Sequence, residues 1–305
     1  MRRDALGQWW SGPFAGAADV RALLAEGVAD ALLPATRPDY PIDDMMLTGL
    51  SAKSTLEAVI AAVETMLAHP TVAEAAARAS VIFEAGLGAG LCTLLLCEAL
   101  ERAGRREVTL WTSDAGETAL LGLVNLARAG HAVRIVDPQT DALTASAGAV
   151  DVGFVPWGFD DPLPAALRGR AELVVADHTI VYVGPGEPGG ARQQRFARRV
   201  NTLLEALAPG GVLVVSEIND AASSAVFEAQ KRRELRRLRR RLFRLQLGAV
   251  VRRLRAFVAA SKVKAPLERL QLQTASVTEV LDGIGERETL LLNGGLVLAH
   301  VVRRR

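Results

Sequence analysis

The chain has 305 residues, of which 50% are hydrophobic and 23% are charged, and its formal net charge is +2. This length allows one large α/β domain with appendages, or two small domains. The longest apolar runs meet acids such as Glu98 and Glu101 before the roughly 20 residues that a membrane span needs, and no apolar signal segment follows the basic start, so we expect a cytoplasmic protein without a transmembrane helix.

The N-terminal part differs in character from the rest of the chain. Its first 50 residues contain two tryptophans, several prolines and the polar cluster RPDYPIDD, which indicate a helical and irregular cap rather than strands. Apolar residues then recur at helical spacing from Ser54 to Leu67, and a second helical pattern, VAEAAARA, covers residues 72–79. We therefore divide the chain into a cap over residues 1–53 and a main α/β domain over residues 54–305.

A glycine-rich turn follows the first expected strand of that domain. The sequence of residues 81–91 is VIFEAGLGAGL, with Glu84 at the end of the strand and with Gly86, Gly88 and Gly90 after it. Glycine permits positive φ and a close approach of the backbone to a ligand, and the Glu84 carboxylate can accept hydrogen bonds from the turn or from the cationic amino end of a ligand. A dinucleotide fingerprint, G-x-G-x-x-G, would need glycine where Leu91 stands. The alternative to a ligand loop is a simple tight connection.

Apolar strand patterns alternate with helical patterns along the rest of the domain. After the turn, the strand patterns are VTLWTSD (108–114), VRIVD (133–137), VGFVPW (152–157), AELVVAD (171–177) and VLVVSEI (212–218). Continuous apolar strands separated by helices predict a parallel sheet that is covered on both faces, which is a doubly wound α/β domain. Near the C-terminus, ETLLLNGGLVLAHVV (288–302) is two apolar runs joined by Asn293, Gly294 and Gly295, which predicts a β-hairpin.

The cysteines and histidines show no metal-ligand pattern. Cys92 and Cys97 are five apart in the helix after the glycine turn, so they do not share a helix face. We interpret them as buried small hydrophobic residues, and no metal site is expected.

Taken together, residues 80–220 and 286–303 resemble the class I S-adenosylmethionine-dependent methyltransferases, and most resemble the seven-β-strand protein-lysine methyltransferases. The corresponding motifs are EAGLGAGL from Glu84, Asp114 in WTSD, Asn125 in LVNLARAG, Trp157 in FVPWG, and Asp177 in VVADHTIVY. The resemblance implies a doubly wound, mostly parallel, seven-stranded Rossmann-like sheet with an antiparallel C-terminal hairpin strand. It also implies S-adenosyl-L-methionine as the cofactor, held by the glycine turn.

The resemblance assigns the remaining cofactor contacts to residues after the next two strands. Asp114, 24 residues after Gly90, stands where a carboxylate can bind both ribose hydroxyls. The alternative for Asp114 is to cap the next helix as a capping box with Glu117. At the adenine end the candidates are Trp157, which would cover the ring face, and either Asp137 or Asp141, which would bind the exocyclic amine. The alternative for Trp157 is to close the edge of the core.

The resemblance places catalysis at Asp177 and Tyr182. Asp177 ends a strand at the carboxyl edge, where α/β ligands collect, and can orient an amine acceptor and take its proton. Tyr182 can supply an aromatic wall. The family pattern is D-x-x-Y, whereas here Tyr182 is five residues after Asp177, so either two residues are inserted or Ile180 occupies the aromatic position.

Between the fifth strand and the hairpin lies a basic helical insertion at about residues 222–262. Its residues 231–255 hold twelve Lys or Arg and one Glu, a local charge of +11, so the rest of the chain carries −9. We expect one long amphipathic helix that binds a protein substrate or RNA. A membrane-surface helix, or a lid whose arginines pair with the acidic body, is the alternative.

These features predict a methyltransferase that acts on a protein side chain, most simply lysine. The arginine-rich helix favours RNA as the alternative substrate, although the chain has no N/D-P-P-Y/F element after strand four. A third hypothesis is a non-catalytic binding protein with the same fold.

Overall fold

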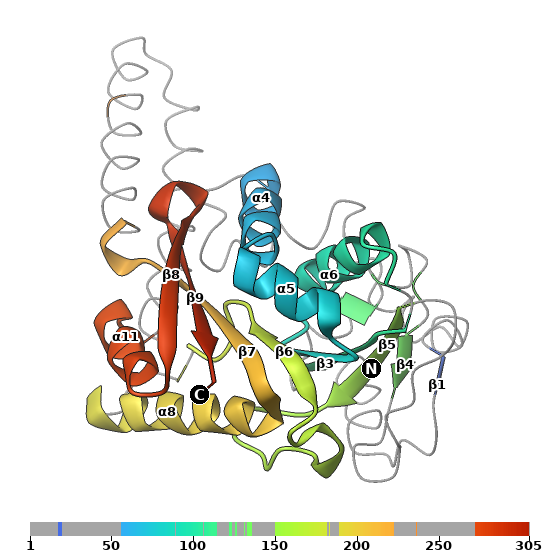
Figure 1. Cartoon of the computed structure of the whole chain (residues 1–305). Helices are drawn as coiled ribbons and strands as arrows, with labels where there is room; N and C mark the ends of the chain where they lie inside the picture. Colours follow the sequence, from blue (N-terminus) through green and yellow to red (C-terminus); the bar gives the residue numbers. More distant parts are fainter. Residues whose placement is uncertain are drawn as a thin grey trace, which may run out of the picture.

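The structure is a computed structural model that describes residues 18–19, 56–88, 90–105, 107–114, 122–123, 126, 131, 133–135, 150–181, 183, 189–222, 236 and 272–304. These residues form one mixed sheet of nine strands in the order β1-β4-β5-β3-β2-β6-β7-β9-β8 (Figure 1). The sheet therefore has more strands than the seven that the resemblance implied. Eight of the nine match strand patterns in the sequence, and β1 is the additional one.

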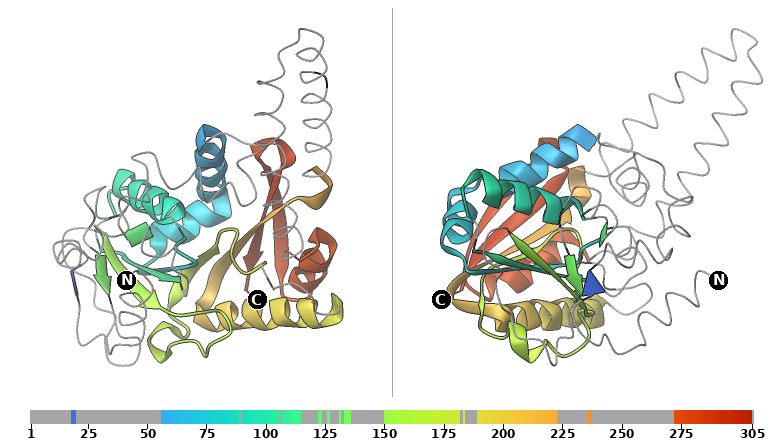
Figure 2. Two further views of the ribbon diagram at one scale, coloured as in Figure 1. Left: turned by 180° about the vertical axis from the view of Figure 1, so that it is seen from behind. Right: turned by 90° about the vertical axis from the view of Figure 1, so that its right-hand side faces the viewer.

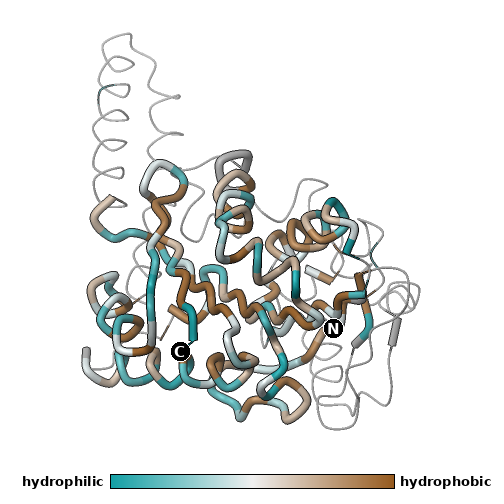
Figure 3. Tube along the Cα trace, in the orientation of Figure 1, coloured by the Kyte–Doolittle hydropathy of each residue, from teal (hydrophilic) through white to brown (hydrophobic). Residues whose placement is uncertain are grey.

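Six neighbouring strands run parallel. They are β4 (Val133–Ile135), β5 (Asp151–Pro156), β3 (Thr109–Asp114), β2 (Val81–Ala85), β6 (Ala171–Ala176) and β7 (Leu207–Ile218). The central strands are buried on both faces, as their continuous apolar sequences require. Figure 3 shows this as an apolar band through the middle of the molecule.

The C-terminal hairpin is confirmed. Strand β8 (Glu286–Leu292) and strand β9 (Val297–Arg303) are antiparallel and are joined by the 3-10 turn η3 (Asn293–Gly295). Asn293, Gly294 and Gly295 all have positive φ, which suits the Asn-Gly-Gly sequence. Strand β9 inserts antiparallel between β7 and β8, so the hairpin completes the sheet from the C-terminal side.

Helices lie on both faces of the sheet (Figures 1 and 2). On one face are α4 (Leu56–Leu67), α5 (Pro70–Arg78) and α6 (Leu91–Arg102), and on the other are α8 (Gly189–Ala206) and α11 (Thr274–Asp282). Each face has its own apolar core, one containing Met66 and Leu96 and the other containing Phe196 and Val277. Cys92 and Cys97 are buried in the first core, as predicted. The described helices include none long and apolar enough to cross a membrane.

The expectation that the N-terminal cap has no strands needs correction, and the expected basic helix lies outside the described residues. Strand β1 (Ala18–Asp19) falls within the cap that the sequence indicated to be free of strands, and it pairs antiparallel with β4. Strand β4 exposes an edge that a short extended segment can pair with, and local composition does not encode this pairing. The basic segment 231–255 lies outside the described residues except for Arg236.

Candidate functional site

The glycine turn leaves the carboxyl end of β2 in a backbone conformation that glycine favours. The φ angles are 103° at Gly86, 49° at Gly88 and 83° at Gly90, all in the left-handed range. A Cβ at residue 86 would lie 2.2 Å from Thr179 Cγ2, and one at residue 90 would lie 3.1 Å from the Gly122 carbonyl oxygen. Both the φ angles and the close contacts therefore account for glycine at alternate positions.

The turn is held by the end of the neighbouring strand. The backbone N–H groups of Gly86 and Leu87 both donate to the Ser113 carbonyl oxygen, at 2.8 and 2.7 Å. The Gly88 N–H donates to Asp114 Oδ2 at 2.8 Å. Asp114 thus ends β3 directly beside the turn, and its contact with a ribose stays a prediction. Glu117, its alternative capping partner, lies outside the described residues.

Glu84 is more deeply buried than a ligand-facing carboxylate was expected to be. It is 1% exposed, and its Oε2 accepts hydrogen bonds from the hydroxyls of Thr93 on α6 and Thr112 on β3, the latter at 3.0 Å. Among the described residues, its Oε1 has no hydrogen-bond partner. Burial raises the pKa of Glu84 to about 8, against the opposing effect of the two threonine hydrogen bonds. Glu84 therefore joins β2 to α6 and β3 beneath the turn.

Trp157 directly follows β5 and lies in the core on the α8 side of the sheet. It is 6% exposed, its ring centroid is 5.9 Å from that of Phe83, and its indole N–H lies 3.1 Å from the Pro162 carbonyl oxygen. The ring centroid of Phe159 is 5.7 Å away in an edge-on arrangement. These contacts fit the core-closing alternative, and the adenine contact stays a prediction.

Asp177 directly follows β6 at the same edge of the sheet as the turn. Its Oδ1 accepts a hydrogen bond from the Ser216 hydroxyl, and Ser216 Oγ accepts the backbone N–H of His178 at 2.9 Å. Ile180, the alternative aromatic position, is fully buried in the core. Tyr182, Asn125, Asp137 and Asp141 lie outside the described residues.

Sequence reasoning missed several residues that complete this edge. Thr179 donates its hydroxyl to the Ala85 carbonyl oxygen at 2.8 Å, which ties the segment after β6 to the turn. His178 has a φ of 51°, which is unusual for a residue other than glycine. A small pocket opens here, and both Asp177 and His178 line it. The sequence signal for this edge is Ser216, a polar residue near the carboxyl end of an otherwise apolar strand.

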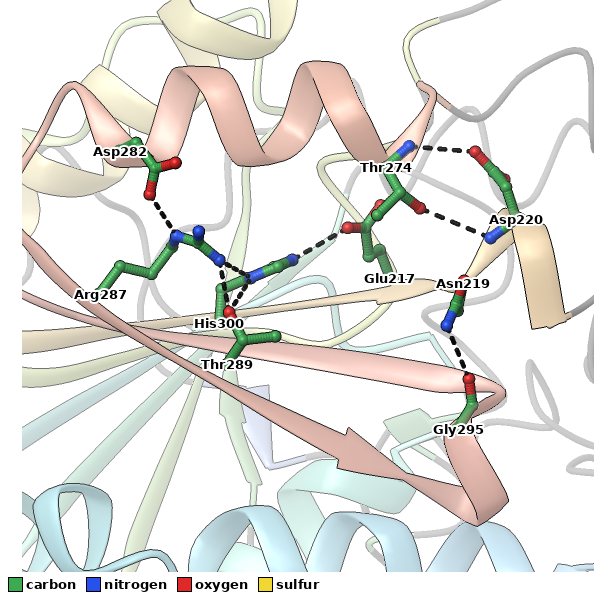
Figure 4. A network of polar contacts seen from close by, with 9 residues as sticks. All are labelled: Glu217, Asn219, Asp220, Thr274, Asp282, Arg287, Thr289, Gly295 and His300. Carbon is green, nitrogen blue, oxygen red and sulfur yellow. Dashed lines mark hydrogen bonds and ion pairs between the residues drawn. The ribbon is translucent and has the colours of Figure 1, made fainter.

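A second polar network lies on the face of β7 opposite to Ser216 (Figure 4). His300 Nε2 is 2.9 Å from Glu217 Oε1, and both side chains are almost fully buried. His300 Nδ1 contacts Arg287 at 3.1 Å, and Arg287 Nε donates to Asp282 Oδ1 at 2.6 Å. Burial raises the pKa of Glu217, and the hydrogen bond with His300 opposes this. The network fixes β9 against β7 and leads to the surface at Asp282.

The fold and the site define a class of protein. A mostly parallel Rossmann-like sheet with antiparallel C-terminal strands, and a glycine turn at its carboxyl edge beside an acidic residue, match a class I methyltransferase fold. Within the described residues, no group of three or more His, Cys, Asp or Glu side chains could hold a metal ion.

Comparison with known proteins finds a relative in sequence. No family model matches the chain. A 4-hydroxy-tetrahydrodipicolinate reductase from Beijerinckia indica is 30% identical over 207 residues, which cover 60% of this chain and 69% of the relative. This identity and coverage place the chain in one sequence family with that reductase.

Several solved structures have similar backbones. An O-methyltransferase family protein from Burkholderia thailandensis has a TM-score of 0.47 at 14% identity, covering 86% of this chain and 58% of its own. An S-adenosylmethionine-dependent methyltransferase in its apo form has a TM-score of 0.48 at 14% identity, covering 79% and 54%. A putative S-adenosylmethionine-dependent methyltransferase from Methanococcus maripaludis has a TM-score of 0.43 at 14% identity, covering 86% and 90%. The chain spans little more than half the length of the first two of these structures.

Proposed function

We propose that the chain binds S-adenosyl-L-methionine and is a methyltransferase. The observation that carries this proposal is the turn: all three glycines of E-x-G-x-G-x-G have positive φ, and the Gly88 N–H is held by Asp114 from the next strand. When bound, the cofactor supplies a methyl group activated by its sulfonium centre. The enzyme's own contribution would be to align the acceptor and to stabilise the charges at the reacting centre.

The residues at the turn suit a cationic ligand that carries a ribose. Asp114 is proposed to bind the ribose hydroxyls with its carboxylate. Glu84 has an acceptor oxygen without a partner among the described residues, so we propose that it receives the ligand's amino end, and ionisation would strengthen that contact. Trp157, with Asp137 or Asp141, remains the proposal for the adenine end.

For the acceptor we propose a protein lysine side chain. The support is Asp177, whose carboxylate lies at the carboxyl edge and can orient an amine. Tyr182 is proposed as an aromatic wall beside it. The basic segment 231–255 is proposed to bind the protein substrate, with RNA as the alternative, because its charge of +11 would attract an anionic surface.

The reductase likeness supports a second candidate, a reductase that uses a nicotinamide dinucleotide, because Rossmann-type turns also bind dinucleotides. Leu91 opposes it, since the dinucleotide fingerprint has glycine at that position. A binding protein without catalysis is the third candidate.

Isothermal titration calorimetry separates these candidates. The methyltransferase proposal expects binding of S-adenosylmethionine, and Asp114→Ala should weaken it strongly. Binding of NADPH without S-adenosylmethionine would favour the reductase, and binding of neither at millimolar ligand would refute both enzymes. Incubating cell lysate with the protein and radiolabelled cofactor, then with RNase or protease, would identify RNA or protein as the acceptor; no label in either would favour the binding protein.

A further inference from the structure

Three successive residues after β6 are each held by a neighbouring strand. The Ser216 hydroxyl of β7 donates to Asp177 Oδ1, and the backbone N–H of His178 donates to Ser216 Oγ at 2.9 Å. Thr179 donates its hydroxyl to the carbonyl oxygen of Ala85, at the end of β2, at 2.8 Å. The segment that carries the proposed catalytic carboxylate is therefore fixed to β7 on one side and to the start of the glycine turn on the other.

Strand register places Ser216 beside Asp177. Strands β6 and β7 are parallel, and the last pair in their register is Ala176 with Val215. Asp177 and Ser216 are the next residues of the two chains, so they lie at the same level of the carboxyl edge. Ser216 is only 1% exposed, and a buried hydroxyl needs hydrogen-bond partners to offset the loss of water. It finds them in Asp177 and in the His178 N–H.

These two contacts fix the direction of the Ser216 hydroxyl proton. A serine hydroxyl has one proton to donate and two lone pairs that accept. Because the His178 N–H can only donate, it occupies a lone pair of Ser216 Oγ, and the hydroxyl proton is directed to Asp177 Oδ1. This bond holds the carboxylate against rotation about its Cβ–Cγ bond. Within the described residues no hydrogen bond reaches Asp177 Oδ2, which leaves that oxygen for a methyl acceptor.

The backbone at His178 depends on the same hydroxyl. Its φ of 51° is uncommon for a residue other than glycine, and such a conformation persists where surrounding contacts fix it. The bond from the His178 N–H to Ser216 is one of these contacts, and the burial of Ile180 and Val181 anchors the chain that follows. Loss of the Ser216 hydroxyl would therefore release both the Asp177 side chain and the backbone next to it.

The other end of the segment is packed against the glycine turn. A Cβ at residue 86 would lie 2.2 Å from Thr179 Cγ2, so the Thr179 side chain fills the space beside Gly86. The distance between Asp177 and the position proposed for the methyl donor is thereby set by contacts at both ends. In-line transfer depends on this alignment, since a displacement of about 1 Å can slow a reaction by about 100-fold.

We propose that Ser216 is a positioning residue for methyl transfer, which holds the Asp177 carboxylate, and through it the methyl acceptor, in line with the donor at the glycine turn. This inference rests on the proposed methyltransferase function. Ser216 is too deeply buried to contact either ligand itself. Its removal should therefore slow the transfer and leave the affinity for the cofactor unchanged.

Rate and affinity are measured separately on the full chain. The rate is the initial transfer of label from saturating radiolabelled S-adenosylmethionine to a heat-treated cell lysate, in which other methyltransferases are inactive, and calorimetry gives the Kd of the cofactor. Ser216→Ala should lower the rate about tenfold and keep the Kd within about twofold of wild type. His300→Ala, which loses a buried contact on the other face of the sheet, is the control for destabilisation and should keep the wild-type rate while folded.

Conservative variants test whether the hydroxyl is what matters. Ser216→Thr keeps the hydroxyl and should retain at least about a third of the wild-type rate. Because the extra methyl group of threonine risks overpacking a buried site, Ser216→Cys is the second variant, and its weaker S–H donor should give a rate between those of wild type and Ser216→Ala. Rates for both variants as low as that of Ser216→Ala, in folded proteins, would contradict the role of the hydroxyl.

A double-mutant cycle tests whether Ser216 acts through Asp177. Asp177→Ala should lower the rate about 100-fold, and adding Ser216→Ala should lower it by less than about twofold more. A residue that only stabilised the fold would multiply the loss instead. Multiplied losses, or a wild-type rate in Ser216→Ala, would overturn this inference alone. A wild-type chain that does not bind the cofactor, or that transfers no label, would refute the proposed function and the inference with it.

Discussion

Replacing Glu84 by glutamine tests how burial controls the site beneath the glycine turn. Glu84 is 1% exposed, and its pKa is raised from 4.5 to about 8 by burial. Between these two values the folded protein holds a proton on Glu84 that the unfolded chain releases. The stabilisation from this group is therefore fully present below pH 4.5 and is lost as the pH rises through 8.

The size of this effect follows from linkage. Each pH unit in the window lowers the free energy of unfolding by about 1.4 kcal/mol. Between the values of 4.5 and about 8, this amounts to roughly 3–5 kcal/mol. Glutamine has nearly the same shape and does not ionise, so Glu84→Gln should be within about 1 kcal/mol of wild type at pH 5 and should be the more stable protein at pH 8.

Urea unfolding of both proteins between pH 5 and pH 9 measures this difference. Glu98→Gln, on the exposed side of α6, removes the same charge without burial and is the control, whose curve should run parallel to wild type. Parallel curves for Glu84→Gln and wild type would refute the reasoning. If ionised Glu84 pairs with the ligand's amino end, the affinity of wild type for S-adenosylmethionine should also rise with pH up to about 8, and that rise should be absent in Glu84→Gln.

Three further predictions concern the turn, the ribose carboxylate and the network of Figure 4. Gly86→Ala should prevent cofactor binding, because its Cβ would lie 2.2 Å from Thr179. The control Gly210→Ala, also at positive φ but with no atom within 4 Å, should cost only about 1–2 kcal/mol of stability and leave binding intact. Equal effects of the two variants in calorimetry and thermal unfolding would contradict this. Asp114→Asn should weaken S-adenosylmethionine binding at least tenfold, about 1.4 kcal/mol, because a neutral amide loses the charge-assisted hydrogen bonds. The surface variant Asp160→Asn should leave binding unchanged. An unchanged Kd for Asp114→Asn would refute the ribose assignment. His300→Ala should lower the free energy of unfolding by about 1–3 kcal/mol, since it leaves Glu217 without its buried partner. The control Thr289→Ala removes an exposed side chain and should change this free energy by less than about 1 kcal/mol. Similar values for both variants in urea titration would show that the buried pair contributes no more than the surface contact.

The features that the sequence predicted correctly depend on local or periodic information. The continuous apolar runs of β2, β3, β6 and β7 predict buried parallel strands because hydrophobicity and strand length are local properties. The glycines of the turn and the Asn-Gly-Gly hairpin are predictable because positive φ restricts which residues fit. The position of Asp114 beside the turn was predictable because it ends a strand that neighbours β2 in a parallel sheet, and its ribose contact stays a prediction.

What the sequence could not predict depends on register between distant segments. Ser216 reaches Asp177, 39 residues away, because β6 pairs Ala176 with Val215, and one step of register would remove that contact. His300 meets Glu217, 83 residues away, as a diagonal neighbour across β7 and β9. The pairing of β1 with β4 and the burial of Trp157 likewise depend on which segments pack together.

The α/β fold class and the glycine turn follow from the sequence alone, since backbone conformation and hydrophobic periodicity are encoded within a few residues. Which side chains share the carboxyl edge depends on the tertiary structure, because strand order and register bring together residues that are far apart along the chain. The lining of the pocket by Asp177 and His178, beneath α4 and the hairpin tip, belongs to this second kind.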